Sequence, residues 1–214
     1  MSEMLTEIHH ADRVRVQSVE LLSDSWGVLK KTVLDYRVHG VRGDVRQTLT
    51  RETYDRGNGA TILLYNRHQR TVILTRQFRY PAYVNPLSGH AYGQWDGMLT
   101  ETCAGLLDEY APEEAIRREV EEETGYRIHQ PQKVFELYMS PGSVTEKLYF
   151  FVAEYSAHEK VTEGGGVQSD GELIEVLELH FDDALDQVRR GEIVDGKTVI
   201  LLQYAQMNGL FDNR

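Results

Sequence analysis

The sequence is poor in cysteine, in long apolar runs and in positive charge, and each shortage limits what the chain can be. Its single cysteine, Cys103, excludes an internal disulfide. No apolar run is long enough to cross a bilayer, and the N-terminal stretch lacks the apolar core of a signal peptide, so we expect a cytoplasmic protein without a membrane partner. With 23 Lys and Arg against 34 Asp and Glu, the net charge of -11 argues against broad nucleic-acid binding.

The residues that are present are typical of a globular protein. With 41% hydrophobic and 27% charged residues, the 214-residue chain can bury one sizeable core, with or without a small N-terminal appendage. Residues 13–22, 28–37 and 45–54 have the composition of strands, and a glycine-containing turn separates the second from the third. We therefore predict a β-rich N-terminal domain over residues 1–56 and a catalytic domain over residues 57–214.

The remainder of the chain alternates between strand and helix patterns. The expected strands are 60–66, 71–78, 133–139, 147–155 and 173–179, and the expected helices are 182–190 and 196–207. Residues 133–139 and 147–155 are apolar enough to be buried on both faces. Residues 80–97 are rich in Pro, Gly and aromatic residues without a clear period, so we expect a long loop there. This loop is either close to a ligand or a surface insertion. This element order is compatible with an α/β fold, a mixed sheet flanked by helices.

The most informative stretch is REVEEETGY, residues 118–126, which holds Glu119, Glu122 and Glu123 within about one helical turn. Pro112 suits a first helical position and Gly125 suits the left-handed residue that ends a helix, so the sequence predicts a helix over residues 112–124. Because like charges at this spacing repel, the cluster indicates either a solvated face or a cation bound between the carboxylates.

The helical period separates these glutamates. Ile116 and Val120 form an apolar stripe, and Glu119 and Glu123 lie along its edge, where we expect them to be half sheltered. Glu121 projects from the opposite side and is expected to be an ordinary solvated charge. The periodicity shows that the glutamates are not equivalent, but it leaves both the cation and the solvated face open.

The same stretch resembles the signature of Nudix hydrolases, whose consensus is a Gly, five residues, a Glu, seven residues and then R-E-U-x-E-E-x-G-U, with U aliphatic or aromatic. Residues 118–126 match every constrained position. The first half departs from the consensus, because Gly105 is followed by one residue too few and Tyr110 stands where the Glu would fall. The resemblance implies the Nudix α/β/α sandwich with a mixed sheet, here joined to a small N-terminal β domain.

The resemblance also implies a divalent metal site. Carboxylate oxygens are the ligands that Mg²⁺ and Mn²⁺ prefer, and these cations bind phosphate oxygens as well. Carried over by position, Glu119 and Glu123 are expected to be direct metal ligands, with the backbone carbonyl of Ala104. A further carboxylate from Glu172 would complete the site, unless Glu172 is only a surface residue before a strand.

Two other roles follow from the same resemblance. Arg118 and Glu122 would orient or supplement the metal ligands. A general base would activate the attacking water, and Glu146 and Glu172 are both candidates. The sequence leaves the choice between them open.

Strings outside that stretch narrow the resemblance to the nucleotide-sugar branch, and most closely to the GDP-mannose pyrophosphatases: YDRGNGATILLYN, RQFR, CAGLLD, ELYMSPGSVTE, GGGV, IEVLEL and GEIVDGKTVILL. The similarity runs over residues 23–208 and implies hydrolysis of GDP-mannose to GMP and mannose 1-phosphate. In that subgroup the substrate contacts would fall on Trp26, Arg51, Glu52, Arg79, Glu146 and Lys197.

These contacts also have plainer interpretations. A Trp in an early strand is more often part of a core than a stacking platform, so both remain open for Trp26. Arg51 and Arg79 could form surface salt bridges, and Lys197 at a helix start is usually solvated. Trp26 and Thr50 replace a Tyr and a Lys of the family member compared, which leaves the base preference open.

The N-terminal strands cannot build much core alone, so we expect a homodimer. Nucleotide-sugar Nudix enzymes are similarly dimeric, often with this domain exchanged, and Trp26 or Arg51 would then reach the site of the partner subunit. Two alternative functions remain: a pyrophosphatase for ADP-ribose or another ADP-sugar, and a non-catalytic Nudix-like sensor of nucleotide sugars. The sensor is less favoured, because Glu119 and Glu123 are both present.

Overall fold

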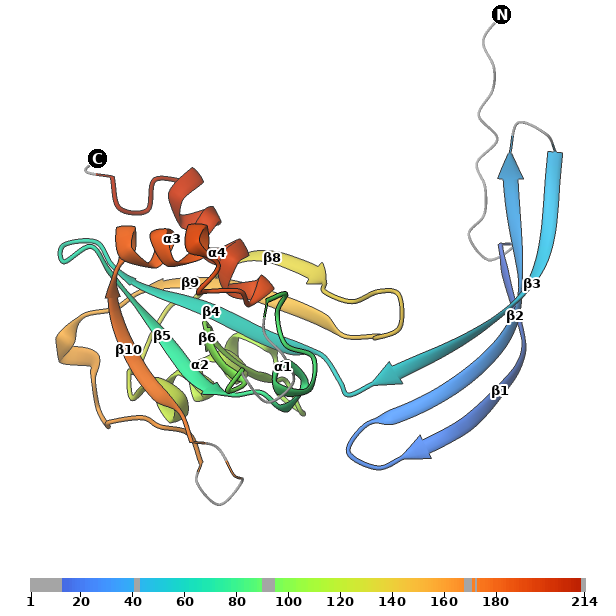
Figure 1. Cartoon of the computed structure of the whole chain (residues 1–214), viewed down its shortest axis with the longest axis horizontal. Coiled ribbons are helices and arrows are strands. Elements are labelled where there is room, and N and C mark those ends of the chain that lie inside the picture. Colours follow the sequence, from blue (N-terminus) through green and yellow to red (C-terminus); the bar gives the residue numbers. More distant parts are fainter. Residues whose placement is uncertain (1–12, 41–42, 90–94, 168–170, 172, 213–214) are drawn as a thin grey trace, which may run out of the picture. The chain divides into compact units, whose positions relative to one another are not determined.

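A computed structural model of the chain describes residues 13–40, 43–89, 95–167, 171 and 173–212. The chain forms two compact units (Figure 1). The first consists of Met1–Gly57 with Ser140–Glu146, and the second of Asn58–Met139 with Lys147–Arg214. None of the described helices is long and apolar enough to span a membrane.

The first unit is an antiparallel sheet of three strands, β1 Val14–Asp24, β2 Val28–Gly40 and β3 Gly43–Asp55, in that order. The predicted strands at 13–22, 28–37 and 45–54 are confirmed. All of β1 is exposed, so this sheet lacks a core of its own. The segment Ser140–Glu146 pairs with the end of β3, where Tyr54 N donates to Ser143 O at 2.8 Å and Thr145 N donates to Tyr54 O at 3.1 Å.

The second unit is built on a seven-stranded sheet whose main order is β10-β5-β4-β9-β8, with β6 beside β5 and β7 beside β4. Its strands are β4 Gly59–Asn66, β5 Thr71–Phe78, β6 Met98–Glu101, β7 Cys103–Leu106, β8 Gln132–Tyr138, β9 Lys147–Glu154 and β10 Glu175–His180. The pairing of β4 with β9 is parallel and the other pairings are antiparallel. The predicted mixed sheet is confirmed.

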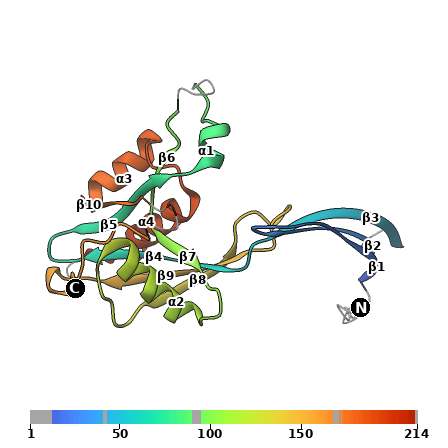
Figure 2. The same ribbon diagram turned by 90° about the horizontal axis from the view of Figure 1, so that it is seen from below.

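Helices cover both faces of this sheet (Figure 2). One face is covered by α3 Phe181–Arg190 and α4 Gly196–Met207, and the other by α2 Pro112–Glu119 with its π-helical continuation η2 Val120–Thr124. The short helices α1 Tyr80–Val84 and η3 Ala157–Glu159, the latter of 3-10 type, bury none of their residues. Leu63 of β4 packs in the core beneath Leu201 of α4, whereas Ile62 points to the other face and joins Ile116 of α2. This alternation of neighbouring side chains builds two cores from one strand. The α/β sandwich expected from the sequence is confirmed.

Two local predictions are wrong. β8 is an edge strand whose side chains alternate between exposed and half-buried, so only β9 is buried as expected. The predicted loop at 80–97 contains the helix α1, because Pro81 takes an early helical position. Residues 90–94 of that segment lie outside the described residues.

Candidate functional site

The acidic helix ends in a wider π-helical turn rather than in a regular α-helix. η2 Val120–Thr124 follows directly on α2, and Gly125 then adopts a left-handed conformation with φ of 78°. A methyl group on Gly125 would lie 2.1 Å from Thr162 O, so the position requires glycine for space as well as for conformation. Helices interrupted by such π turns are frequent at functional sites.

A glycine-rich loop holds this helix end in place. Gly165 N donates to the carbonyl of Glu123 at 2.9 Å, and Gly166 N donates to that of Glu122 at 3.1 Å. These bonds satisfy carbonyls that a helix C-terminus otherwise leaves without partners. Through Gly165 and Gly166, this loop therefore anchors the helix that carries the glutamates.

Glu119 and Glu123 converge on β7. Glu123 is 3% exposed, and its Oε2 accepts a hydrogen bond from Ala104 N at 3.2 Å. The Glu119 carboxyl group lies against Gly105, where an added Cβ would be 2.0 Å from its Oε1. Gly105 thus provides the space that Glu119 occupies, which explains why glycine stands at this position.

The environment makes Glu123 hard to ionise. Burial and, to a smaller extent, the negative charge of Glu119 raise the pKa of Glu123 to about 8, against hydrogen bonds from Cys103 and Ala104 and the positive charge of Arg79. Burial likewise raises the pKa of the Cys103 thiol, so Cys103 has the character of a small buried residue rather than of a nucleophile.

The donor groups fit a hard divalent cation. Two carboxylates lie beside the β7 backbone, and the charge of Glu119 makes ionisation of Glu123 more costly, so a cation between them would relieve that cost. Within the described ranges, no group of three or more His, Cys, Asp or Glu side chains is arranged around a metal position. Glu172, the further ligand expected from the sequence, lies outside the described residues.

The other charged residues of the acidic stretch lie on the surface of the helix. Glu122 is exposed, and Glu121 forms an ion pair with Arg127 at 2.7 Å rather than standing alone in solvent. The guanidinium of Arg118 lies 4.0 Å from the centroid of the Tyr110 ring. Tyr110, which replaces the consensus Glu, therefore supports Arg118 through a cation–π contact.

A buried carboxylate that sequence reasoning missed organises the basic residues. Glu101, at the end of β6, is 3% exposed, and its two oxygens accept from Arg79 Nε at 2.8 Å and from Lys197 Nζ at 2.7 Å. The solvated interpretation of Lys197 is wrong, because its side chain is only 12% exposed and also contacts Asp195 at 3.0 Å. The sequence signal that could have identified Glu101 is a glutamate within the strand segment LTETC, at a position that faces inward.

The remaining predicted residues belong to the first unit. Trp26 is 71% exposed in the turn after β1, so the core interpretation is wrong and its ring is open to stacking. Arg56, which sequence reasoning also missed, lies 6.0 Å from the Trp26 ring centroid. Its Nη2 pairs at 2.7 Å with Oε1 of Glu146, whose side chain is 10% exposed.

Arg51 and Glu52 are exposed on neighbouring positions of β3, where Arg51 Nη1 donates to Thr50 O at 2.9 Å. The predicted site residues are thus divided between the two units. The second unit holds Glu119, Glu123, Ala104, Arg79 and Lys197, and the first holds Trp26, Arg51, Glu52 and Glu146.

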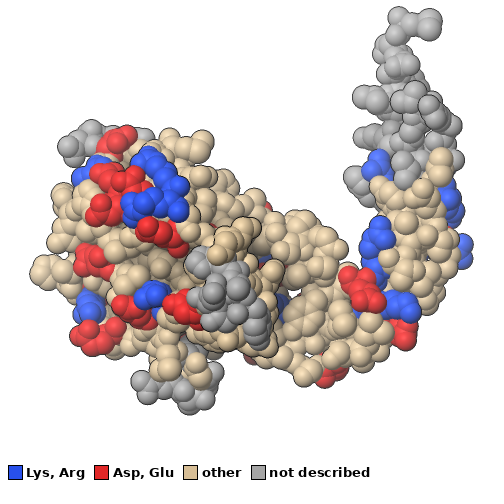
Figure 3. Space-filling view, viewed as in Figure 1, with Lys and Arg blue, Asp and Glu red and all other residues tan. Residues whose placement is uncertain are grey.

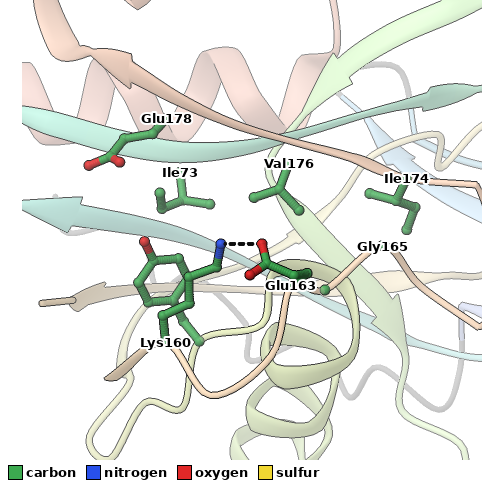
Figure 4. A pocket seen from close by; sticks show the side chains of 9 residues that line it. Ile73, Lys160, Glu163, Gly165, Ile174, Val176 and Glu178 are labelled. Carbon is green, nitrogen blue, oxygen red and sulfur yellow. Dashed lines mark hydrogen bonds and ion pairs between the residues drawn. The ribbon is translucent and has the colours of Figure 1, made fainter. Parts of the chain in front are cut away.

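Beside the glycine-rich loop, a separate cavity of about 310 Å³ opens in the second unit. Ile73, Ile174 and Val176 line it, and the Lys160–Glu163 ion pair, 2.8 Å long, closes one side (Figure 4). It contains none of the site residues predicted from the sequence. Over the face drawn in Figure 3, acidic and basic side chains of this unit are interspersed.

Two family models match this chain, and the boundary between their matches lies close to the boundary between the two structural units. Residues 55–200 match the family described as NUDIX domain, and residues 13–54 match the one described as GDP-mannose pyrophosphatase NudK N-terminal domain. The chain is 54% identical to a GDP-mannose pyrophosphatase of Klebsiella pneumoniae over 92% of its length and 93% of the relative's. A GDP-mannose pyrophosphatase of Pectobacterium atrosepticum is 55% identical over 90% of this chain and 93% of its own.

Proposed function

Because this chain belongs to the Nudix hydrolases, we propose that it cleaves the diphosphate of a nucleotide sugar, most specifically GDP-mannose to GMP and mannose 1-phosphate. The observation that carries the proposal is the convergence of Glu119 and Glu123 on β7, within electrostatic reach of the Arg79 guanidinium. A divalent cation and a cationic side chain are the two kinds of group that stabilise a diphosphate under attack.

In this proposal Glu119, Glu123, the Ala104 carbonyl and Glu172 would hold the metal, Mg²⁺ or Mn²⁺. When bound, it supplies a water of lowered pKa and neutralises charge on the phosphates. Glu123 must lose its proton before it can serve as a ligand, because its pKa of about 8 keeps it neutral below that pH. Metal binding therefore releases a proton.

The basic side chains bind the diphosphate. The contact of Arg79 with Glu101 uses Nε, so the two terminal nitrogens are not consumed by it and can grip a phosphate through two bonds. Lys197 supplies a compact charge. Trp26 offers its exposed ring to the base, and Arg51 and Glu52 offer polar contacts from β3.

The general base is Glu146 or Glu172. Arg56 fixes the Glu146 carboxylate by their 2.7 Å ion pair, which gives it a defined orientation. A base must reach the attacking water before its pKa matters. Replacement of each by Gln would decide between them, since only loss of the base removes the acidic limb of the pH–rate profile.

We also propose that residues 1–56 are a dimerisation domain. A bulge between Val16 and Ser18 places Val14, Val16, Val19 and Leu21 on one face of β1, and each of them is at least 48% exposed. In the strand register Arg51 lies on the same face, opposite Thr32. A second copy that covers the apolar side chains would therefore receive Arg51 as well.

A cytoplasmic location is part of the same proposal. A chain with a single cysteine has no internal disulfide to gain from an oxidising compartment.

One experiment tests the activity. The purified protein is incubated with Mg²⁺ and a panel of nucleotide sugars, ADP-ribose included, in water labelled with oxygen-18, and the products are weighed by mass spectrometry. We expect GDP-mannose to be cleaved fastest, and the labelled product identifies the phosphorus that is attacked. A preference for ADP-ribose above about tenfold, or about 1.4 kcal/mol, would reject the proposed substrate.

A further inference from the structure

We propose that Glu101 is a positioning residue of this site: its buried carboxylate holds Arg79 and Lys197 side by side, in the orientation in which they meet the diphosphate. The inference rests on the proposed hydrolysis, and it assigns a role to a residue that touches neither metal nor substrate.

The bridging geometry is the first support. Arg79 Nε donates to Oε2 of Glu101 at 2.8 Å, and Lys197 Nζ donates to Oε1 at 2.7 Å, so each carboxylate oxygen holds one cation. Arg79 precedes α1, and Lys197 lies in the first turn of α4. Two separate elements are thus joined through a third, β6.

Burial is the second support. The Glu101 side chain is 4% exposed, whereas the Arg79 side chain is 41% exposed. A carboxylate removed from water to this extent is costly unless paired, and losing its partners leaves a buried charge without compensation. The pairing therefore fixes the inner nitrogen of Arg79, although the outer part of its side chain is accessible to a ligand.

The connection of Glu101 to the acidic pair is the third support. Glu101 is followed by Thr102, whose backbone N donates to Thr198 Oγ1 at 2.7 Å, and then by Cys103 and Ala104, which hydrogen-bond to Glu123. One short stretch of chain therefore fixes both the basic residues and the carboxylates. A displacement of about 1 Å at such a site can reduce the rate about a hundredfold.

Removal of the Glu101 charge acts on two kinetic parameters in different ways. Loss of a negative charge favours binding of an anion, whereas loss of fixed cation geometry opposes it, so KM should change little. The transition state needs the cations in place, so kcat should fall. This separates Glu101 from a residue that only binds substrate, whose loss raises KM.

The variant Glu101→Gln tests the role, and Glu136→Gln is its matched control. Glu136 also bridges two cations, Lys133 at 2.9 Å and Lys147 at 2.7 Å, but on the exposed edge strand β8. With GDP-mannose and Mg²⁺, we expect kcat of Glu101→Gln to fall about tenfold or more and kcat of Glu136→Gln to stay within about twofold. An unchanged kcat in Glu101→Gln would overturn the proposal.

A mutant cycle separates positioning from general damage to the fold. In a background with Arg79→Ala and Lys197→Ala, Glu101→Gln should cause no further loss of kcat, because the residues through which it acts are absent. The same fractional loss in both backgrounds would show a role that does not pass through the two cations. If Glu101→Gln does not fold, Glu101→Asp replaces it in the cycle, since the shorter carboxylate cannot reach both cations.

A readout without substrate keeps this inference apart from the proposed activity. Reductive methylation followed by peptide mass spectrometry reports how accessible each lysine is. Lys197 should react slowly in the unaltered protein and several-fold faster in Glu101→Gln, and equal rates would overturn the holding role. If the unaltered protein fails to cleave GDP-mannose, the proposed function falls, while the methylation rates still decide whether Glu101 holds Lys197.

Discussion

At the scale of single residues, the neighbours of Glu119 and Glu123 give these two glutamates the environment on which the proposed metal site depends. Gly105 gives space to Glu119, and burial against Ala104 and Cys103 raises the pKa of Glu123. The exposed Glu122 has the same chemistry without this environment. Position in the fold, more than residue type, therefore distinguishes the proposed metal ligands from Glu122.

Glu123→Gln should stabilise the metal-free protein in a pH-dependent way. The folded-state pKa of Glu123 is raised from 4.5 to about 8, so the unfolded chain loses this proton first as pH rises, and the stability of the folded state declines between these values. The gain of the variant should therefore be absent below pH 4.5 and reach a few kcal/mol by about pH 8. Urea unfolding in EDTA at several pH values measures it.

The same variant should lose metal binding and slow turnover by about two orders of magnitude or more, because a neutral amide cannot replace a charged ligand. Added Mg²⁺ should raise the melting temperature of the unaltered protein and leave that of Glu123→Gln unchanged. For the urea unfolding described above, Glu122→Gln is the control, and its stability should vary with pH as that of the unaltered protein does. Full turnover in Glu123→Gln would reject the metal site.

Gly105→Ala tests the space provided for Glu119. An added Cβ would lie 2.0 Å from the Glu119 carboxyl, so this side chain must move away from its position. We expect activity to fall about tenfold or more, since the displaced carboxylate no longer faces Glu123. Gly142→Ala is the control, because nothing lies within 4 Å of its added Cβ. Equal rates in both variants would show that Glu119 needs no such space.

At the scale of elements, the site depends on how the acidic helix ends. The π turn and Gly125 direct the Glu122 and Glu123 carbonyls to Gly166 and Gly165, so the loop and the helix hold each other. β7 meets the same helix through Ala104. The glycine-rich loop and β7 thus hold the helix that carries the glutamates from two sides.

Gly125→Ala should be more destabilising than Gly191→Ala. Both glycines are left-handed, at φ of 78° and 72°, and an alanine in that conformation costs about 1–2 kcal/mol. At Gly191 nothing lies within 4 Å of an added Cβ, whereas at Gly125 it would meet backbone of Thr162 at 2.1 Å. We expect a few additional kcal/mol of destabilisation at Gly125, measured by urea unfolding. Equal losses of unfolding free energy in the two variants would mean that the loop at Thr162 can move away from the added methyl group without an energetic cost.

At the scale of the whole molecule, the first unit presents an apolar sheet face that it cannot bury itself. Val14, Val16, Val19 and Leu21 would expose this area in a monomer. Such a face is accounted for if a second copy covers it.

Val16→Asp should therefore shift the protein from dimer to monomer. A carboxylate introduced into a covered apolar face has no partner, and its burial is costly. Val161→Asp is the matched control, because Val161 is similarly exposed, at 45% against 54%, but belongs to the second unit. Light scattering at micromolar concentration measures both masses, and a monomer before any substitution would remove the dimer proposal.

The sequence by itself determined the elements and the acidic helix, because the signals for these are local. Strand alternation, Pro112 and Gly125 each act within a few residues, and the helical period was enough to set Glu119 and Glu123 apart from Glu121. The helix that carries the proposed metal ligands could therefore be predicted without a structure.

Only the tertiary structure decided how the basic half is held. Glu101 meets Arg79 across 22 positions of sequence and Lys197 across 96, and no local pattern marks such contacts. The same holds for the exposed Trp26 beside Arg56 and for the space at Gly105. Side chains become buried and paired only when distant segments pack together. The burial that lets Glu101 hold two cations therefore exists only in the folded chain.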